Sequence, residues 1–201
     1  MADQVIISIG REFGSGGHEI AQSLSEFYHL DLYDQNLLEQ VAKEYHLDSQ
    51  ELYSLDEKKK NQLFARTVKG MTNSPAENVA NLQFNFLRKK AESGESFVVV
   101  GRCSDYILKG HPGLISIFVL GDKETKIERV MKLYNLSREK AILFMEENDR
   151  RRKKYHNSHC PIKWGDSRGY DLSINSSRLG IPESVKIIRE YIEMRIKMSE
   201  K

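Results

Sequence analysis

The sequence predicts an α/β fold, a three-layer arrangement in which helices cover both faces of a parallel sheet of about five strands. Two observations favour it: apolar runs alternate with amphipathic helical segments, and the runs are continuously apolar, as is typical of strands buried on both faces. A chain of 201 residues without an internal repeat suits a single domain, residues 1–201.

The expected strands are short runs of β-branched and other apolar residues that end at glycine or polar residues. We expect the first of them to lie in the centre of the sheet. The runs are residues 5–9, 31–34, Phe97–Val100, Leu114–Leu120 and 170–174.

Helices are expected between these strands, where apolar residues recur every three or four positions. The first begins after Gly17. The chain from residue 35 to about residue 93 is expected to be helical throughout and to form an insertion, residues 35–95, in which the polar stretches 56–60 and 70–75 are predicted to be mobile. Later helices are expected at Lys123–Tyr134, at residues 137–155 and from Pro182 onward.

The composition excludes several classes of protein. A net charge of +2 gives no general basis for nucleic-acid binding. No apolar segment approaches the roughly 20 residues that span a bilayer, and the first residues do not resemble a signal peptide. We therefore expect a cytoplasmic protein with no membrane partner and no nucleic-acid partner, and we leave open whether it forms a homo-oligomer.

The two cysteines, Cys103 and Cys160, are too few for a disulfide framework. In a reducing compartment they are expected to be free thiols. His156 and His159 lie near Cys160 in the sequence, but further ligands at suitable spacing are lacking, so we predict no metal site at these residues.

The connection between the first strand and the first helix is rich in glycine. Residues 10–17 contain four glycines, which destabilise a fold unless the backbone takes positive φ or approaches something closely. At a strand-to-helix turn that something is usually phosphate, because the first amides and the dipole of the helix attract anions. A tight turn without a ligand is the alternative. The residues predicted to bind phosphate are Gly14, Ser15, Gly16, Gly17 and His18.

This turn departs from the Walker A pattern G-x-x-x-x-G-K-[ST], whose lysine contacts the β- and γ-phosphates. Gly17 stands in place of the lysine, and the loop is one residue longer. The missing charge is expected from Arg11 inside the loop, from His18 or from a distant arginine. His18 is less suited, because a helix N-terminus disfavours a protonated imidazole.

Two further groups are candidates for contact with anions. Arg102 directly follows a predicted strand, at the edge where parallel sheets bind ligands, and Asp105 could accept a hydrogen bond from a sugar or base. The run at 149–154 ends a long helix; its Arg150 and Arg151 are predicted to belong to a lid, residues 148–169, that closes over a transferred phosphoryl group. Solvated surface is the alternative for both groups, and nucleic-acid contact is a further alternative for the run.

Four blocks, in the order found along nearly the whole chain, resemble the cytidylate-kinase-like family. They are Ile7-Ser-Ile-Gly-Arg-Glu-Phe-Gly-Ser-Gly-Gly17, Tyr33-Asp34, Val98-Val-Val-Gly-Arg-Cys-Ser-Asp-Tyr-Ile-Leu108 and Asp171-Leu-Ser-Ile-Asn-Ser-Ser177. The resemblance implies a P-loop NTPase fold with an inserted monophosphate-binding region and an arginine-bearing lid.

The resemblance also implies roles for single residues. Arg102 matches the arginine of a Gly-Arg-Asp segment that contacts the acceptor, with Cys103 in place of the aspartate. Asp149, Arg150 and Arg151 match the lid pattern. Residues 175–177 are similar to an Asp-Ser-Thr segment near the end of true cytidylate kinases.

Together these inferences predict ATP-dependent phosphorylation of a nucleoside monophosphate, CMP or dCMP first, with ATP and Mg²⁺ as cofactors. Nucleotides are the expected partners. The residues predicted to stabilise the moving phosphoryl group are Arg11, Arg150 and Arg151, and those predicted to bind the acceptor are Asp34, Arg102 and Asp105. Two alternatives stay open: a nucleotide-binding sensor or partner protein without catalysis, supported by Gly17, and a kinase for another small acceptor, supported by Cys103.

Overall fold

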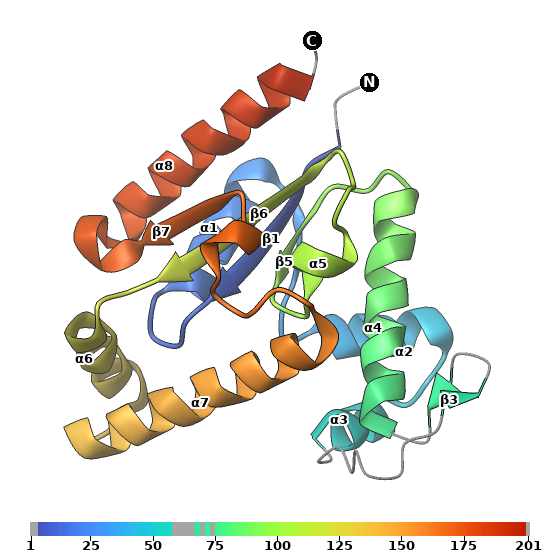
Figure 1. Cartoon of the computed structure of the whole chain (residues 1–201), viewed down its shortest axis with the longest axis horizontal. Coiled ribbons are helices and arrows are strands. Elements are labelled where there is room, and N and C mark those ends of the chain that lie inside the picture. Colours follow the sequence, from blue (N-terminus) through green and yellow to red (C-terminus); the bar gives the residue numbers. More distant parts are fainter. Residues whose placement is uncertain (1–3, 58–66, 69–70, 73–74, 200–201) are drawn as a thin grey trace.

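The computed structural model describes residues 4–57, 67–68, 71–72 and 75–199, and it has the three layers that the sequence predicts (Figure 1). Its five-stranded sheet has the order β2-β5-β1-β6-β7, and all pairings in this sheet are parallel. The central position of the first strand is confirmed. The strands are β1 (Ile6–Arg11), β2 (Asp31–Tyr33), β5 (Phe97–Val100), β6 (Leu114–Leu120) and β7 (Leu172–Asn175).

Helices follow most strands and cover both faces of the sheet. The helix expected from Pro182 onward is the second part of a longer one, α8, which is broken at Gly180 (φ 77°, ψ 167°). The helices of the described residues are α1 (Gly17–Tyr28), α2 (Leu37–Tyr45), α3 (Ser49–Glu57), α4 (Pro75–Glu92), α5 (Ser104–Ile107), α6 (Lys123–Tyr134), α7 (Arg138–His159) and α8 (Ser176–Ser199), with a 3₁₀ turn, η2, at Ser167–Gly169.

Strand β1 shows why the sequence of the sheet is continuously apolar. Ile7 and Ile9 pack into a core with α1 and α8 on one face, and Ile6 packs into a second core with α2 and α4 on the other. Ser8 also lies on the second face, where its Oγ is 2.7 Å from the Oγ of Ser104 in α5. Burying one aliphatic side chain contributes roughly 1.5–3 kcal/mol, so a strand packed on both faces is strongly favoured at this position.

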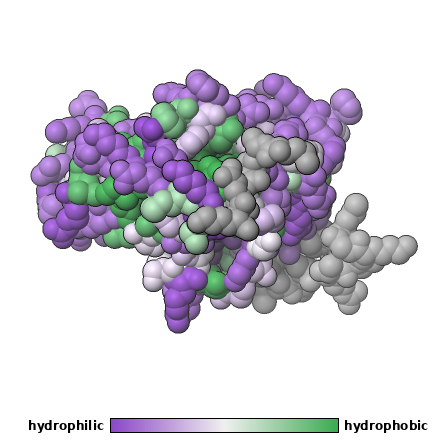
Figure 2. Space-filling model, turned by 90° about the horizontal axis from the view of Figure 1, so that it is seen from above, coloured by the Kyte–Doolittle hydropathy of each residue, from purple (hydrophilic) through white to green (hydrophobic). Residues whose placement is uncertain are grey.

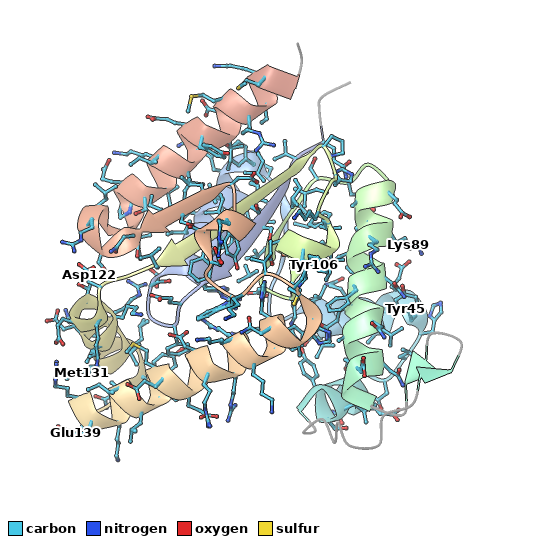
Figure 3. The ribbon with its side chains drawn as sticks, in the orientation of Figure 1. Tyr45, Lys89, Tyr106, Asp122, Met131 and Glu139 are labelled. Atoms are coloured by element: carbon cyan, nitrogen blue, oxygen red, sulfur yellow. The ribbon has the colours of Figure 1, made fainter. Side chains whose placement is uncertain are left out.

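The segment between β2 and β5 contains α2, α3, α4 and a short antiparallel pair, β3 (Thr67–Val68) and β4 (Met71–Thr72). The expectation of helix throughout this segment is therefore wrong at β3 and β4, because two-residue strands are too short to show a period. Lys89 of α4, labelled in Figure 3, forms an ion pair with Glu44 of α2. Of the stretches predicted to be mobile, 56–60 and 70–75, residues 58–60, 70 and 73–74 lie outside the described residues.

Helix α7 lies across the edge of the sheet where the strands end, below the strand arrows in Figure 1. It packs against α6 through a small core that contains Ile127, Val130, Ala141 and Met145. The helix continues to His159, beyond the expected end at residue 155. Hydrophilic residues dominate the face seen in Figure 2, and none of the helices in the described part of the chain has the length and apolar character to cross a membrane.

Candidate functional site

The loop between β1 and α1 is shaped by two glycines. Gly14 (φ 80°) and Gly16 (φ 77°) lie in the left-handed region, where a side chain is strained. Gly16 is the N-cap of α1, and the Cβ of any other residue there would also lie 2.5 Å from Cδ1 of Ile181 in α8. Because the first amides of a helix have no partner inside it, the loop ends in a geometry that suits an anion.

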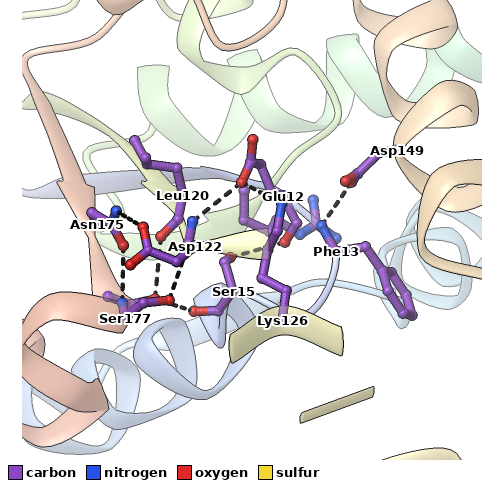
Figure 4. Close-up of polar contacts among 12 residues, drawn as sticks. Glu12, Phe13, Ser15, Leu120, Asp122, Lys126, Asp149, Asn175 and Ser177 are labelled. Carbon is purple, nitrogen blue, oxygen red and sulfur yellow. Dashed lines mark hydrogen bonds and ion pairs between the residues drawn. The ribbon is translucent and has the colours of Figure 1, made fainter. Parts of the chain in front are cut away.

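Polar contacts join the loop to neighbouring segments of the fold (Figure 4). The Glu12 carboxylate accepts hydrogen bonds from the Gly121 amide at 3.1 Å and from Lys126 Nζ at 2.7 Å. Ser15 Oγ donates to the carbonyl of Glu12 at 2.8 Å, and Ser176 Oγ donates to the carbonyl of Ser15 at 2.6 Å. The loop is therefore tied to the end of β6, to α6 and to the start of α8.

Asp122, which follows β6, holds the start of α8 beside the loop. Its Oδ1 accepts from Asn175 Nδ2 at 2.9 Å, its amide donates to Ser177 Oγ at 2.9 Å, and its Oδ2 lies 3.1 Å from Nε of Arg178. The segment 175–177, similar to the Asp-Ser-Thr of cytidylate kinases, thus packs directly behind the glycine-rich loop.

Arg11 is a half-buried cation at the centre of this region. Burial lowers its pKa to about 9, and the guanidinium groups of Arg152 and Arg102 act in the same direction, while the carboxylates of Asp34 and Asp149 oppose them. Three arginines from three separate segments thus surround one place at the edge of the sheet, with two carboxylates among them. Such a cluster favours an anion, because an anion relieves the repulsion among the cations.

The side chain of Arg11 runs between two glycines. A Cβ on Gly17 would lie 2.5 Å from the Cβ of Arg11, and a Cβ on Gly101 would lie 2.4 Å from its Nη1. Real Cβ atoms do not approach other atoms this closely, so both positions require glycine while Arg11 keeps this conformation. Gly17, which stands where a Walker A lysine is expected, leaves the space that Arg11 fills.

The segment after β5 has an unusual backbone. Gly101, Arg102 and Cys103 follow one another with φ of 77°, 55° and 56°, and left-handed conformations of non-glycine residues are strained and concentrate at functional sites. The amide and Oγ of Ser104 both donate to the carbonyl of Gly101, at 3.1 and 2.8 Å. The Cζ of Arg102 lies 5.7 Å from the centre of the Tyr155 ring in α7. This backbone directs Arg102 towards the helix that crosses the site.

Helix α7 contacts the loop through Asp149 and Arg152. Asp149 Oδ1 accepts from the amide of Phe13 at 2.7 Å, and Arg152 Nη1 donates to the carbonyl of Arg11 at 3.3 Å. The Cζ of Arg152 also lies 5.2 Å from the centre of the Phe13 ring. Burial raises the pKa of Asp149, whereas the Phe13 amide and the Arg152 guanidinium lower it. Helix α7 therefore contacts both the backbone of the loop and the ring of Phe13.

The two lid arginines chosen from the sequence lie on another face of α7. The side chains of Arg150 and Arg151 are 76% and 74% exposed, and both pair with Glu147, Arg151 at an Nε–Oε1 distance of 2.9 Å. The structure therefore brings Arg152 to the loop, and it does not bring Arg150 or Arg151 there.

The other predicted residues are divided between two places. Asp34, at the end of β2, lies near the loop, and its Oδ2 is 3.4 Å from Nδ1 of His18. Asp105 is half-buried at the start of α5, where its Oδ2 lies 3.0 Å from Nε2 of His156. Its carboxylate is thus occupied by a histidine of α7. Within the described ranges, no group of three or more His, Cys, Asp or Glu side chains is arranged to hold a metal ion.

Sequence reasoning missed Arg152 and Lys126. A signal for Arg152 existed: Ala141, Met145, Asp149, Arg152 and His156 recur every three or four residues and are buried or half-buried, so they define the inner face of α7. No comparable signal marks Lys126, because its partner Glu12 is more than a hundred residues away in the sequence.

Comparison with known proteins agrees with this architecture. The model of the Cytidylate kinase-like family matches residues 6–178. A solved structure of an uncharacterized protein from Eubacterium ventriosum ATCC 27560 is 41% identical, with a TM-score of 0.76 over 94% of this chain and 99% of that chain. No curated protein matches the chain.

More distant structures share the fold alone. Shikimate kinase from Bacteroides thetaiotaomicron is 14% identical, with a TM-score of 0.55 over 94% of this chain and 98% of that chain. Shikimate kinase from Acinetobacter baumannii in complex with shikimate is 11% identical, with a TM-score of 0.53 over 96% of this chain and 95% of that chain. With a P-loop kinase fold and a family match over most of its length, the chain belongs to the cytidylate kinase-like family, which indicates phosphoryl transfer to a small acceptor.

Proposed function

We propose that the protein transfers the γ-phosphoryl group of ATP to a nucleoside monophosphate, CMP or dCMP first. The observation that carries the proposal is the convergence of Arg11, Arg102 and Arg152 from the loop, from the end of β5 and from α7. Phosphoryl transfer depends mainly on positioning and on neutralising charge, so it needs no nucleophile from the protein. Arginines brought together at one place supply the positive charge that this reaction requires.

On the donor side, the backbone amides of residues 14–18 are proposed to hold the phosphates of ATP. Their fit rests on the left-handed glycines of the loop and on the free first amides of α1. Arg11 is proposed to supply the charge that lysine supplies in a Walker A loop. When bound, ATP provides the phosphoryl group and Mg²⁺ neutralises part of its charge.

On the acceptor side, Arg102 is proposed to hold the phosphate of the monophosphate, because a guanidinium forms two parallel bonds with a phosphate group. Asp34 lies on the same side of the site, near Arg11. Residues 35–95 are proposed as the acceptor-binding insertion and residues 148–169 as the lid. The lid roles of Arg150 and Arg151, and contact of Asp105 with the acceptor, stay predictions.

An ADP-release assay with a panel of acceptors tests the proposal. The panel contains CMP, dCMP, UMP, AMP and GMP, together with shikimate as a non-nucleotide acceptor, and ATP binding is titrated in parallel. We expect release of ADP to depend on CMP or dCMP. Dependence on shikimate alone would assign another acceptor, and tight ATP binding with no transfer to any of them would favour a sensor.

A further inference from the structure

The two cysteines of the chain lie together at the edge of the proposed site. Cys103 directly follows Arg102, and Cys160 is the residue at which α7 ends. Both are buried in one small apolar cluster with Ala80 and Phe84, and their side chains share a hydrogen bond. Because the sequence contains only these two cysteines, any disulfide within one chain must join them.

The surroundings distinguish the two sulfur atoms. The hydrogen bond from Cys103 and the nearby His156 ring lower the pKa of Cys160, although burial opposes this effect. The same hydrogen bond and burial raise the pKa of Cys103. His156 is itself held by Asp105 at 3.0 Å. The thiolate is therefore favoured at Cys160, and Cys103 stays protonated beside it.

Cys160 is buried, but a cavity gives small molecules access to it. A cavity of about 280 Å³ lies between α5, the start of β6 and the segment that follows α7, and Cys160 is on its wall together with Asp105, His156 and Tyr170. Reactive thiols of redox sensors are low in pKa, accessible and adjacent to a second cysteine that resolves the oxidised form. All three conditions meet at this pair.

We propose that Cys160 and Cys103 form a redox-modification site that hydrogen peroxide converts into a disulfide. The thiolate of Cys160 attacks one oxygen of the peroxide; the S–O bond forms, the O–O bond breaks, and hydroxide leaves. The sulfur of Cys103 then attacks the sulfur of this sulfenic acid and expels a second hydroxide. Two thiol protons convert the two hydroxides to water, so the two cysteines lose two electrons and the peroxide gains them.

The disulfide joins the end of α7 to the segment that carries Arg102. A lid must move relative to the rest of a kinase during each turnover, and a covalent link at Cys160, inside the proposed lid, opposes that movement. Oxidation is therefore expected to reduce turnover reversibly. This functional consequence rests on the proposed function, but formation of the disulfide does not.

The test treats the folded wild-type protein with hydrogen peroxide and maps its peptides without reduction. We expect one peptide pair joined through Cys103 and Cys160, loss of both free thiols, and recovery of the thiols with dithiothreitol. Cys103→Ser should instead give a trappable sulfenic acid at Cys160, and Cys160→Ser should resist peroxide. If the protein has kinase activity, peroxide should lower the activity of the wild type as the disulfide forms, and dithiothreitol should restore it. The activity of Cys160→Ser should not change under either treatment.

A second variant tests the role assigned to His156. In His156→Gln the reaction of Cys160 with peroxide at neutral pH should slow by about tenfold or more, because the pKa returns towards the ordinary value near 8.5. The proposal is overturned if the native thiols survive peroxide that consumes them in urea, if the product is an intermolecular disulfide or sulfinic acid, or if His156→Gln reacts as fast as wild type. Absence of kinase activity with a normal disulfide would overturn the proposed function alone.

Discussion

A Cβ on Gly17 would lie 2.5 Å from the Cβ of Arg11. Two departures from the Walker A pattern, the missing lysine and the arginine inside the loop, are therefore parts of one arrangement. The glycine makes room for the arginine, and the arginine brings a positive charge to the place that lacks the lysine. A single substitution at residue 17 should therefore not convert this arrangement into a working Walker A loop.

Restoring the lysine is expected to harm the protein. In Gly17→Lys the new Cβ collides with the Cβ of Arg11 next to the loop backbone. The loop amides should therefore shift, ATP affinity should fall about tenfold or more, or roughly 1.4 kcal/mol, and turnover should not rise. Calorimetric titration with ATP checks this. The control is Gly94→Ala, whose new Cβ meets nothing within 4 Å but has φ of 83°; it should lower stability by about 1–2 kcal/mol without changing ATP affinity. Tighter ATP binding by Gly17→Lys would contradict the arrangement.

Arg11 itself is expected to act mainly on the transition state. Arg11→Ala should lower kcat by about a thousandfold or more, as loss of an arginine finger does, while ATP affinity changes much less. Arg11→Lys should recover little, because an ammonium does not reproduce the planar fork. Thermal unfolding of both variants tests whether the fold is kept. A folded Arg11→Ala protein with nearly normal kcat would remove Arg11 from the mechanism.

Arg152 and Arg151 form a matched pair on one helix. Arg152→Ala should reduce kcat by about tenfold or more, because its guanidinium contacts the carbonyl of Arg11 and arginine contacts to phosphoryl groups are worth this much or more. Arg151→Ala should have a small effect, because its side chain is 74% exposed and such ion pairs contribute little. Steady-state kinetics of both variants decide the matter. The reverse order would restore the role predicted for Arg151 from the sequence.

This pair also shows where the sequence suffices and where it does not. The strands were predictable because apolar runs buried on two faces leave a continuous pattern, and the loop was predictable because its glycines interrupt a strand-to-helix transition. Which residues of α7 face the site is less evident. Residues 150–154 are five cations in succession, and composition alone does not show which of them point inward. Only the spacing from Ala141 and Met145 assigns Arg152 to the inside.

Contacts between distant segments were beyond the sequence altogether. The pairing of Glu12 with Lys126, and that of Asp105 with His156, joins residues whose own neighbourhoods carry no sign of a partner. Asp105 lies only three residues after Arg102 in the chain, but the turn after β5 sends the two side chains to different partners, His156 and Tyr155. Such pairings depend on the packing of whole helices rather than on any local pattern.

Arg102 is expected to determine acceptor affinity. Arg102→Ala should weaken monophosphate binding by roughly 1.5–3 kcal/mol, the scale of a charge-assisted hydrogen bond, and Arg102→Lys should rescue it poorly. Titration with CMP measures this, and ATP affinity, which depends on the loop, serves as the internal control. Unchanged CMP affinity in both variants would assign Arg102 to structure only.

His156 predicts a pH dependence of stability. Burial disfavours its charge, but the hydrogen bond to Asp105 and the adjacent Cys160 raise its pKa from 6.5 to about 10. A histidine whose pKa is raised by folding stabilises the fold fully below the unfolded pKa, and the contribution is lost as pH rises through the folded one. His156→Gln should therefore be most destabilised, relative to wild type, below pH 6.5, with a difference that shrinks up to about pH 10.

Urea unfolding across that range checks the window, with a variant at the exposed His46, changed likewise to glutamine, as the control for composition. A difference between His156→Gln and wild type that grows with pH would mean that the histidine is neutral in the fold.

The contact of Ile181 with the loop bears on where the protein can be shortened. Its Cδ1 would lie 2.5 Å from a Cβ on Gly16, so the start of the last helix rests on the N-cap of the first. The family match ends at residue 178, before this isoleucine and before Ile188 and Ile192 of the core. A protein truncated at residue 178 would therefore lose the contact of Ile181 with Gly16 and expose that side of the glycine-rich loop. Expression trials should keep the chain to residue 199.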